Sequence, residues 1–105
     1  GGGGPRAGGG LTFLFPPARE NNPKPLSRRS LDCCMDNLQD VVIGNLRKGD
    51  VVSRCSVSQY IVMLPQANYE NSCMVCDRIL RAFARQYPHS PAKLGYTVQP
   101  LVPNA

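Results

Sequence analysis

Two stretches with helical apolar spacing, separated by two short β-branched runs, constrain the fold of this chain most. In the first stretch, apolar residues recur every three or four positions from Leu31 to Leu46, after Ser27 or Ser30 as a candidate N-cap. The second stretch begins after Asn68, another candidate cap. Its expected inward face comprises Cys76, Ile79, Leu80, Phe83 and Tyr87. Both stretches therefore predict amphipathic helices that need an apolar surface to pack on.

Runs rich in β-branched, aromatic and aliphatic residues predict four strands. Val51–Cys55 and Tyr60–Leu64 indicate a hairpin, Leu11–Phe15 a strand stopped by prolines, and Leu94–Leu101 a last strand. The order is then β-α-β-β-α-β. It predicts an α+β fold of the ferredoxin-like sandwich type, in which two helices cover one face of a four-stranded antiparallel sheet.

The first ten residues differ in composition from the rest of the 105-residue chain. The segment 1–10 holds seven glycines and no large side chain, so we expect a disordered Gly-rich leader. Four prolines between residues 16 and 25 indicate an irregular connection. Residues 11–105 are then long enough for one domain with one modest core.

Composition also narrows the class of protein. No run of 18 apolar residues is present, so we expect no membrane association and a cytoplasmic location. Five cysteines, an odd number, indicate reduced thiols rather than a disulfide framework. The net charge of +5 is spread along the chain without a dense basic block, which is weak support for nucleic-acid binding.

The stretch from Met35 to Pro65, MDNLQDVVIGNLRKGDVVSRCSVSQYIVMLP, resembles the core of GGDEF domains, the bacterial diguanylate cyclases. Arg54-Cys55 stands where the family has Arg-Tyr. Residues Ser56, Val57, Ser58, Gln59 and Tyr60 stand at the signature hairpin. The chain looks closest to the degenerate GGDEF-like domains attached to transcriptional regulators that carry a bacterial transcriptional activator domain (BTAD, SARP-like). This resemblance implies a truncated GGDEF-like core with a regulatory role in signal transduction and transcription.

The same resemblance implies that the chain is not an enzyme. In active members, the hairpin glycines let the backbone approach the nucleotide phosphates, and acidic residues hold magnesium. Here Val57 adds a branched side chain, and Ser58 and Gln59 are neutral, so they cannot balance the charge of Mg²⁺. The family's other metal aspartate follows the first strand, where this chain has Phe15-Pro16-Pro17. We therefore expect neither catalytic residues nor a cofactor.

Arg47-Lys48-Gly49-Asp50 keeps the Arg-x-x-Asp spacing of the family's inhibitory site for cyclic di-GMP. A guanidinium can pair with a guanine edge or a phosphate through two parallel hydrogen bonds. The alternative is structural: Gly49 and Asp50 form a turn, and Arg47 is a solvated cation at the end of a helix.

Two further groups of residues have both a functional and a structural interpretation. Arg78, Arg81 and Arg85 would line one basic helix face, which can contact nucleic acid or can simply be solvated. Tyr60 has no aromatic neighbour with which to stack bases, so we do not expect direct nucleic-acid contact. Cys73-x-x-Cys76, with Cys33-Cys34, has a zinc-like spacing, but small apolar packing is favoured, and we predict no metal site.

The expected partners follow from the missing chemistry. We expect a domain that keeps its fold without catalysis to function through contacts with other protein domains. Proline-rich coil replaces the family's helix after the first strand, which should leave apolar surface uncovered for such contacts. We expect the partners to be other domains of its own regulator or a second copy, with a cyclic dinucleotide as a candidate ligand.

Overall fold

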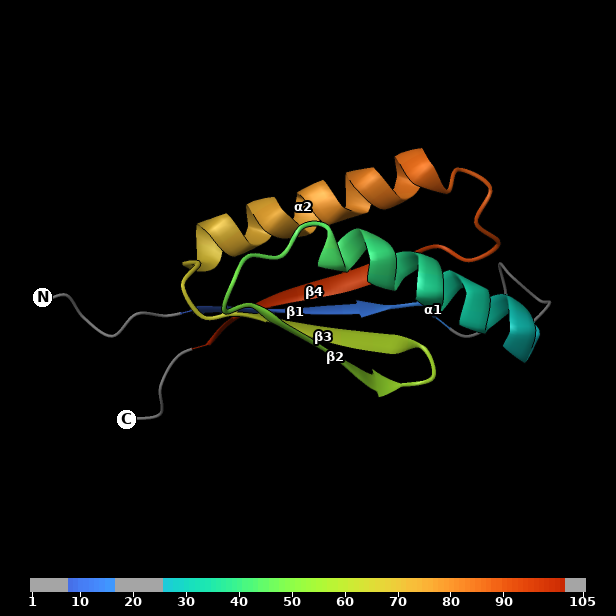
Figure 1. Cartoon of the computed structure of the whole chain (residues 1–105), viewed down its shortest axis with the longest axis horizontal. Coiled ribbons are helices and arrows are strands. Elements are labelled where there is room, and N and C mark those ends of the chain that lie inside the picture. The colour runs from blue at the N-terminus through green and yellow to red at the C-terminus, as the bar shows by residue number, and fades with distance from the viewer. Residues whose placement is uncertain (1–7, 17–25, 102–105) are drawn as a thin grey trace, which may run out of the picture.

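The chain folds into two layers, a sheet and a pair of helices on one of its faces (Figure 1). The computed structural model describes residues 8–16 and 26–101. The elements in chain order are β1 (Gly8–Leu14), α1 (Arg28–Ile43), β2 (Val51–Ser56), β3 (Gln59–Leu64), α2 (Tyr69–Gln86) and β4 (Gly95–Leu101). The predicted order β-α-β-β-α-β is therefore confirmed.

The sheet has the strand order β2-β3-β1-β4, with antiparallel neighbours throughout. The central strand β1 pairs with β3 on one side and β4 on the other, and Phe13 lies opposite both Tyr60 and Tyr96. This is the ferredoxin-like arrangement, and the predicted fold class is confirmed.

The prediction of a disordered leader through residue 10 is wrong for Gly8–Gly10, because these residues form the start of β1. The reason is the close approach of α2. A Cβ built on Gly9 would overlap the hydroxyl of Ser72, which is fully buried under the helix. Glycine is thus required for backbone contact at this position. The strand also ends one residue earlier than predicted, at Leu14, and residues 1–7 lie outside the described part of the chain.

Both helices begin at side-chain caps of the kind that the sequence predicts. Of the two serine candidates, Ser27 is the N-cap of α1, and its Oγ accepts a hydrogen bond from the Ser30 amide at 3.1 Å. Asn68 caps α2, and its Oδ1 accepts from the Asn71 amide at 2.8 Å. Each cap satisfies one of the amides that a helix start leaves without a partner.

The core lies between the helices and the inner face of the sheet. Its fully buried large side chains come from both layers: Phe13, Leu11, Met35, Leu38, Leu64, Ile79, Val42 and Val62. Of the predicted inward face, Leu80 on α2 and Tyr87, which caps its C-terminus, are only half-buried, whereas the small residues Ser72 and Ala82 are buried. Small residues let α2 lie close to the sheet.

None of the helices in the described ranges is long and apolar enough to cross a membrane.

Candidate functional site

The hairpin between β2 and β3, where the GGDEF signature would stand, is held together by its own arginine. Arg54 Nε donates to the carbonyl oxygen of Ser56 at 3.2 Å, and its Nη2 donates to that of Val57 at 3.0 Å. The same guanidinium lies 3.5 Å from Asp32 Oδ1 on α1. The Arg54 side chain therefore stabilises the turn of the hairpin through two hydrogen bonds and connects the hairpin to α1 through Asp32.

The hairpin contains no carboxylate, and the acid that contacts its arginine is already paired. Asp32 also accepts from Arg28 Nε at 3.0 Å. The hydrogen bond from Arg28 holds the pKa of the Asp32 carboxyl below its usual value, against a partial desolvation that raises it, and Arg54 adds to the lowering. Within residues 8–16 and 26–101, no three His, Cys, Asp or Glu side chains come together in a group that could hold a metal ion.

The remaining hairpin side chains also contact the protein itself. Ser58 donates its amide to Ser56 Oγ at 3.2 Å, and Cys55 Sγ lies 3.5 Å from Gln59 Oε1. Tyr60 points into the core, where its hydroxyl donates to Gln39 Oε1 at 3.4 Å, and burial raises the pKa of its phenol. The Ser56–Tyr60 hairpin is a packed turn with neutral side chains.

The turn from Arg47 to Asp50 lies after α1 and before β2. The Arg47 amide donates to Asp50 Oδ2 at 2.8 Å, the Asp50 amide donates to the Arg47 carbonyl at 3.0 Å, and Gly49 has φ +96°. The interpretation of Gly49-Asp50 as a turn is therefore confirmed. The interpretation of Arg47 as a helix-end cation is wrong, because α1 ends four residues earlier, at Ile43.

The structure brings Arg78 to the same place as Arg47 and Asp50. All three line a pocket of about 290 Å³ between the α1–β2 loop, the end of β3 and the first half of α2. Its lining includes one further cation and three amides, Lys48, Asn45, Gln66 and Asn71. We call this the cationic pocket. It combines three cations and several hydrogen-bonding groups with one carboxylate, a composition that suits an anionic ligand.

Arg78 is held in the cationic pocket through a short chain of hydrogen bonds. Its Nε donates to Asn45 Oδ1 at 2.8 Å, and Asn45 Nδ2 donates to the carbonyl of Val41 at 2.8 Å in the last turn of α1. The spacing of Arg78, Arg81 and Arg85 predicts a basic stripe on α2. Nothing in the local sequence connects Arg78 with Arg47, because the contact depends on how the α1–β2 loop returns beside α2.

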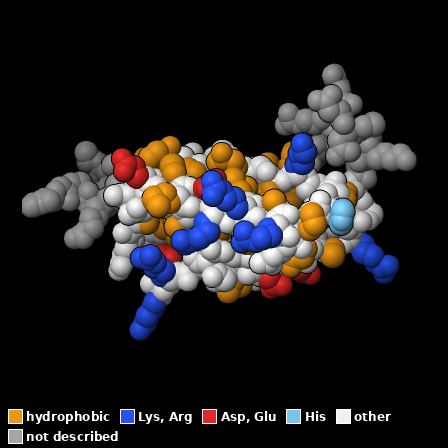
Figure 2. Space-filling model, turned by 90° about the horizontal axis from the view of Figure 1, so that it is seen from above, with side chains coloured by type: hydrophobic (Ala, Val, Ile, Leu, Met, Phe, Trp, Pro, Cys, Tyr) orange, Lys and Arg blue, Asp and Glu red, His pale blue; other side chains and the backbone are white. Residues whose placement is uncertain are grey.

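The predicted basic stripe is divided by these contacts. Arg81 Nε pairs with Asp77 Oδ2 at 3.0 Å one helical turn away, and Arg85 lies exposed in the last turn of α2. Figure 2, which views the helix layer from outside, shows Lys and Arg side chains spread over this face. Of the three arginines, Arg78 belongs to the cationic pocket, while Arg81 forms a helical ion pair.

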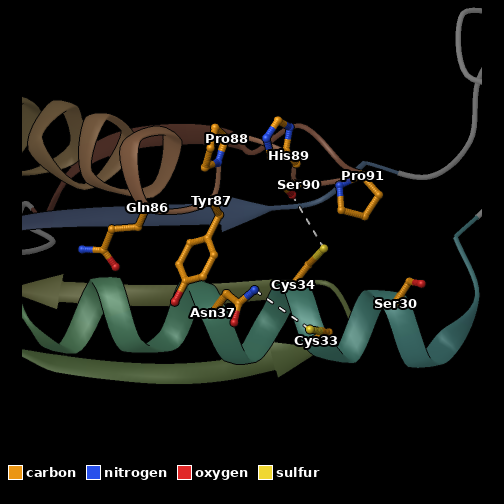
Figure 3. Close-up of a pocket in the computed structure, with 10 residues that line it drawn as sticks. All are labelled: Ser30, Cys33, Cys34, Asn37, Gln86, Tyr87, Pro88, His89, Ser90 and Pro91. Carbon is orange, nitrogen blue, oxygen red and sulfur yellow. Dashed lines mark hydrogen bonds between the residues drawn. The ribbon is translucent and has the colours of Figure 1, made fainter.

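A second pocket, of about 380 Å³, lies between the first half of α1 and the loop after α2 (Figure 3). The residues that line it include no Lys, Arg, Asp or Glu, and among them are Tyr87, His89 and Asn37. Cys34 Sγ lies 3.7 Å from Ser90 Oγ at its base. This pocket was not predicted from the sequence, since the loop Tyr87–Pro91 stands out there mainly by its two prolines.

The five cysteines are free thiols. Cys34 and Cys76 are buried, Cys73 is half-buried, and Cys33 and Cys55 are exposed. Burial raises the pKa of the Cys76 thiol to about 11, with smaller contributions from Cys73 and Asp77. A buried thiol of this kind acts as a small apolar packing group.

Comparison with known proteins supplies a structural neighbour. No model of a known protein family matches the chain, and no curated protein matches it. Among solved structures, the chain is similar to a DGC (diguanylate cyclase) protein from Thermotoga maritima, with a TM-score of 0.66 and 10% sequence identity. The match covers 90% of this chain and 64% of that chain. The fold is GGDEF-like. At this identity the likeness concerns the fold alone.

Proposed function

We propose that this domain is a non-catalytic regulatory and interaction module, built on a GGDEF-like fold and belonging to a bacterial transcriptional regulator. The observation that carries the proposal is the hairpin of residues 56–60. Its side chains are neutral, and the carbonyl oxygens of Ser56 and Val57 accept from Arg54. A hairpin closed in this way offers neither a glycine backbone for phosphates nor a carboxylate for magnesium. The link to a regulator rests on the sequence resemblance.

A cyclase assay tests the absence of catalysis. The protein is incubated with GTP and Mg²⁺ or Mn²⁺ beside an active diguanylate cyclase, and cyclic di-GMP is quantified by chromatography. We expect no product above the no-enzyme control, because the hairpin has no metal-binding acid. Formation of cyclic di-GMP that is abolished by Gln59→Ala would overturn the proposal.

The cationic pocket supports a second candidate function, the binding of cyclic di-GMP. Arg47 and Asp50 are the residues that the Arg-x-x-Asp resemblance implies, and Arg78 and Lys48 line the same pocket. Asp50 Oδ2 accepts the Arg47 amide, which fixes the carboxylate, whereas the Arg47 guanidinium lies on an exposed residue and is available to a ligand. Two arginines from separate elements suit a ligand with two phosphates.

Calorimetric titration with cyclic di-GMP tests this candidate. If the pocket binds the dinucleotide, we expect micromolar affinity, weakened about tenfold or more by Arg47→Ala and by Arg78→Ala. Arg81→Ala is the matched control, because Arg81 lies on the same helix but pairs with Asp77 outside the pocket. The absence of heat at high ligand concentration, or equal weakening by all three variants, would exclude this function.

A further inference from the structure

The outer face of the sheet, on the side opposite the helices, is open in the described part of the chain (Figure 1). Strand pairing identifies its side chains, because residues alternate between the two faces and paired residues share a face. The alternating burial of β1 and β3 fixes Leu11, Phe13, Tyr60 and Val62 as inward. Their neighbours in sequence therefore point outward.

The outer face combines apolar side chains with neutral polar ones. Its apolar members are Leu14, Val51, Ile61, Met63 and Leu101, and its polar members are Thr12, Ser53, Gln59, Thr97 and Gln99. Val51 is 54% exposed, Met63 43% and Ile61 37%. Ile61 lies near the middle, with Thr12 beside it on β1 and Ser53 beside it on β2.

This face carries no charged side chain among the residues described. The four strands together contain one charged residue, Arg54, and its contact with Asp32 of α1 places it on the helix side. The charges in the described ranges are otherwise on the helices and their adjoining loops, and Figure 2 shows cations over the helix layer. The two sides of the molecule thus differ sharply in charge.

We propose that the outer face of the sheet is a self-association surface, on which a second copy of this chain packs sheet against sheet. This inference rests on the proposed function, because it names the surface that an interaction module would use. Two copies each carry a net charge of +5, so like-charge repulsion opposes a contact least where the touching surfaces hold no charge. The outer face meets this condition, whereas an acidic partner would instead be drawn to the helix layer.

The size of the face predicts a weak dimer. Four strands about 4.8 Å apart and about six residues long at 3.4 Å per residue give a flat area of roughly 400 Å² per copy. Two such faces bury roughly 800 Å² in total, which lies below the roughly 1,200 Å² of standard interfaces and in the range of weak, transient ones. We therefore expect association in the micromolar range, in a two-fold arrangement that brings Ile61 of each copy near the centre of the contact.

Sedimentation velocity of the full chain from about 5 to 500 µM, in about 0.15 M salt, tests the proposal. We expect a reversible monomer–dimer equilibrium that Ile61→Lys weakens at least tenfold, because the variant places two like charges at the centre of the contact. Met74→Lys is the matched control. Met74 is a 67% exposed apolar residue on α2, outside the sheet face, and its replacement should leave association unchanged.

A second variant covers the case in which Ile61→Lys fails to fold. Ser53→Lys adds a charge to the same face on the edge strand β2, where lysine is well tolerated. A monomer throughout the concentration range, or a dimer insensitive to the folded sheet variants, overturns the self-association surface. Either result leaves the non-catalytic module standing, because that proposal is decided separately by the cyclase assay.

Discussion

Gly9 and Gly10 are chemically identical neighbours on β1, yet they face different environments. The Gly9 α-carbon faces α2, where an added Cβ would overlap the Ser72 hydroxyl. Ser72 Oγ also donates to the carbonyl of Asn68 at 2.8 Å, so this side chain is tied to the start of the helix. A Cβ added at Gly10 would point to the opposite side of the sheet, where its nearest neighbour would be Leu101 Cδ2, the flexible end of that side chain, at 3.2 Å.

We therefore predict that Gly9→Ala destabilises the domain by about 1–3 kcal/mol, because the methyl group pushes α2 away from the sheet. Gly10→Ala, the matched control, should change the free energy of unfolding by less than about 0.5 kcal/mol, since Leu101 can move and alanine loses less backbone entropy on folding than glycine. Urea denaturation of the two variants measures the difference. Equal destabilisation would contradict the close approach of α2 at Gly9.

At the scale of single elements, the β2–β3 hairpin depends on Arg54 for contacts beyond its strand ladder. We predict that Arg54→Ala speeds hydrogen exchange of the hairpin amides and lowers stability by about 1 kcal/mol, because it removes the donor for two carbonyl oxygens. Arg28→Ala is the control, since Arg28 donates to the same Asp32 carboxylate, whereas the two hairpin carbonyl oxygens accept from Arg54. If both variants speed exchange of the hairpin amides equally, the effect comes from Asp32 rather than from the Arg54 tie.

Elements with strong local signals were predictable from the sequence. Ser27 and Asn68 mark the two helix starts, and Gly49 marks the turn, because capping and positive φ depend on the residue itself and its immediate neighbours. The start of β1 was not predictable in this way. A run of glycine signals flexibility, whereas the strand depends on partners distant in sequence: Gly9 pairs with Leu64 and Pro100, and Ser72 of α2 lies close above it.

The candidate site likewise has one part that neighbouring residues determine and another part that depends on contacts between distant residues. The turn of Arg47 and Asp50 follows from the spacing of four neighbouring residues. The contribution of Arg78 to the cationic pocket could not be predicted, because it requires the α1–β2 loop to lie beside α2, with Asn45 as the link. The pocket of Figure 3 was missed for a similar reason, since it forms between the start of α1 and a loop more than fifty residues later.

For the molecule as a whole, β1 is the strand on which both halves of the sheet depend. It pairs with β3 through Gly9↔Leu64 and Gly10↔Met63, and with β4 through Gly8↔Leu101 and Gly9↔Pro100. Removing the first residues of a central strand leaves backbone hydrogen-bonding groups without partners on both neighbouring strands. The deletion therefore weakens the pairing on both sides of β1.

A pair of deletions tests this dependence. Removal of residues 1–10 should cost roughly 2–4 kcal/mol, because several backbone hydrogen bonds at about 1 kcal/mol each are lost from two strand pairs. That is a large share of the total stability of a small domain. Removal of residues 1–7 leaves every described pairing of β1 intact and should cost less than about 0.5 kcal/mol. Equal midpoints in urea for the two deletions would mean that Gly8–Gly10 add nothing to the sheet, and that the domain is held from Leu11 onward.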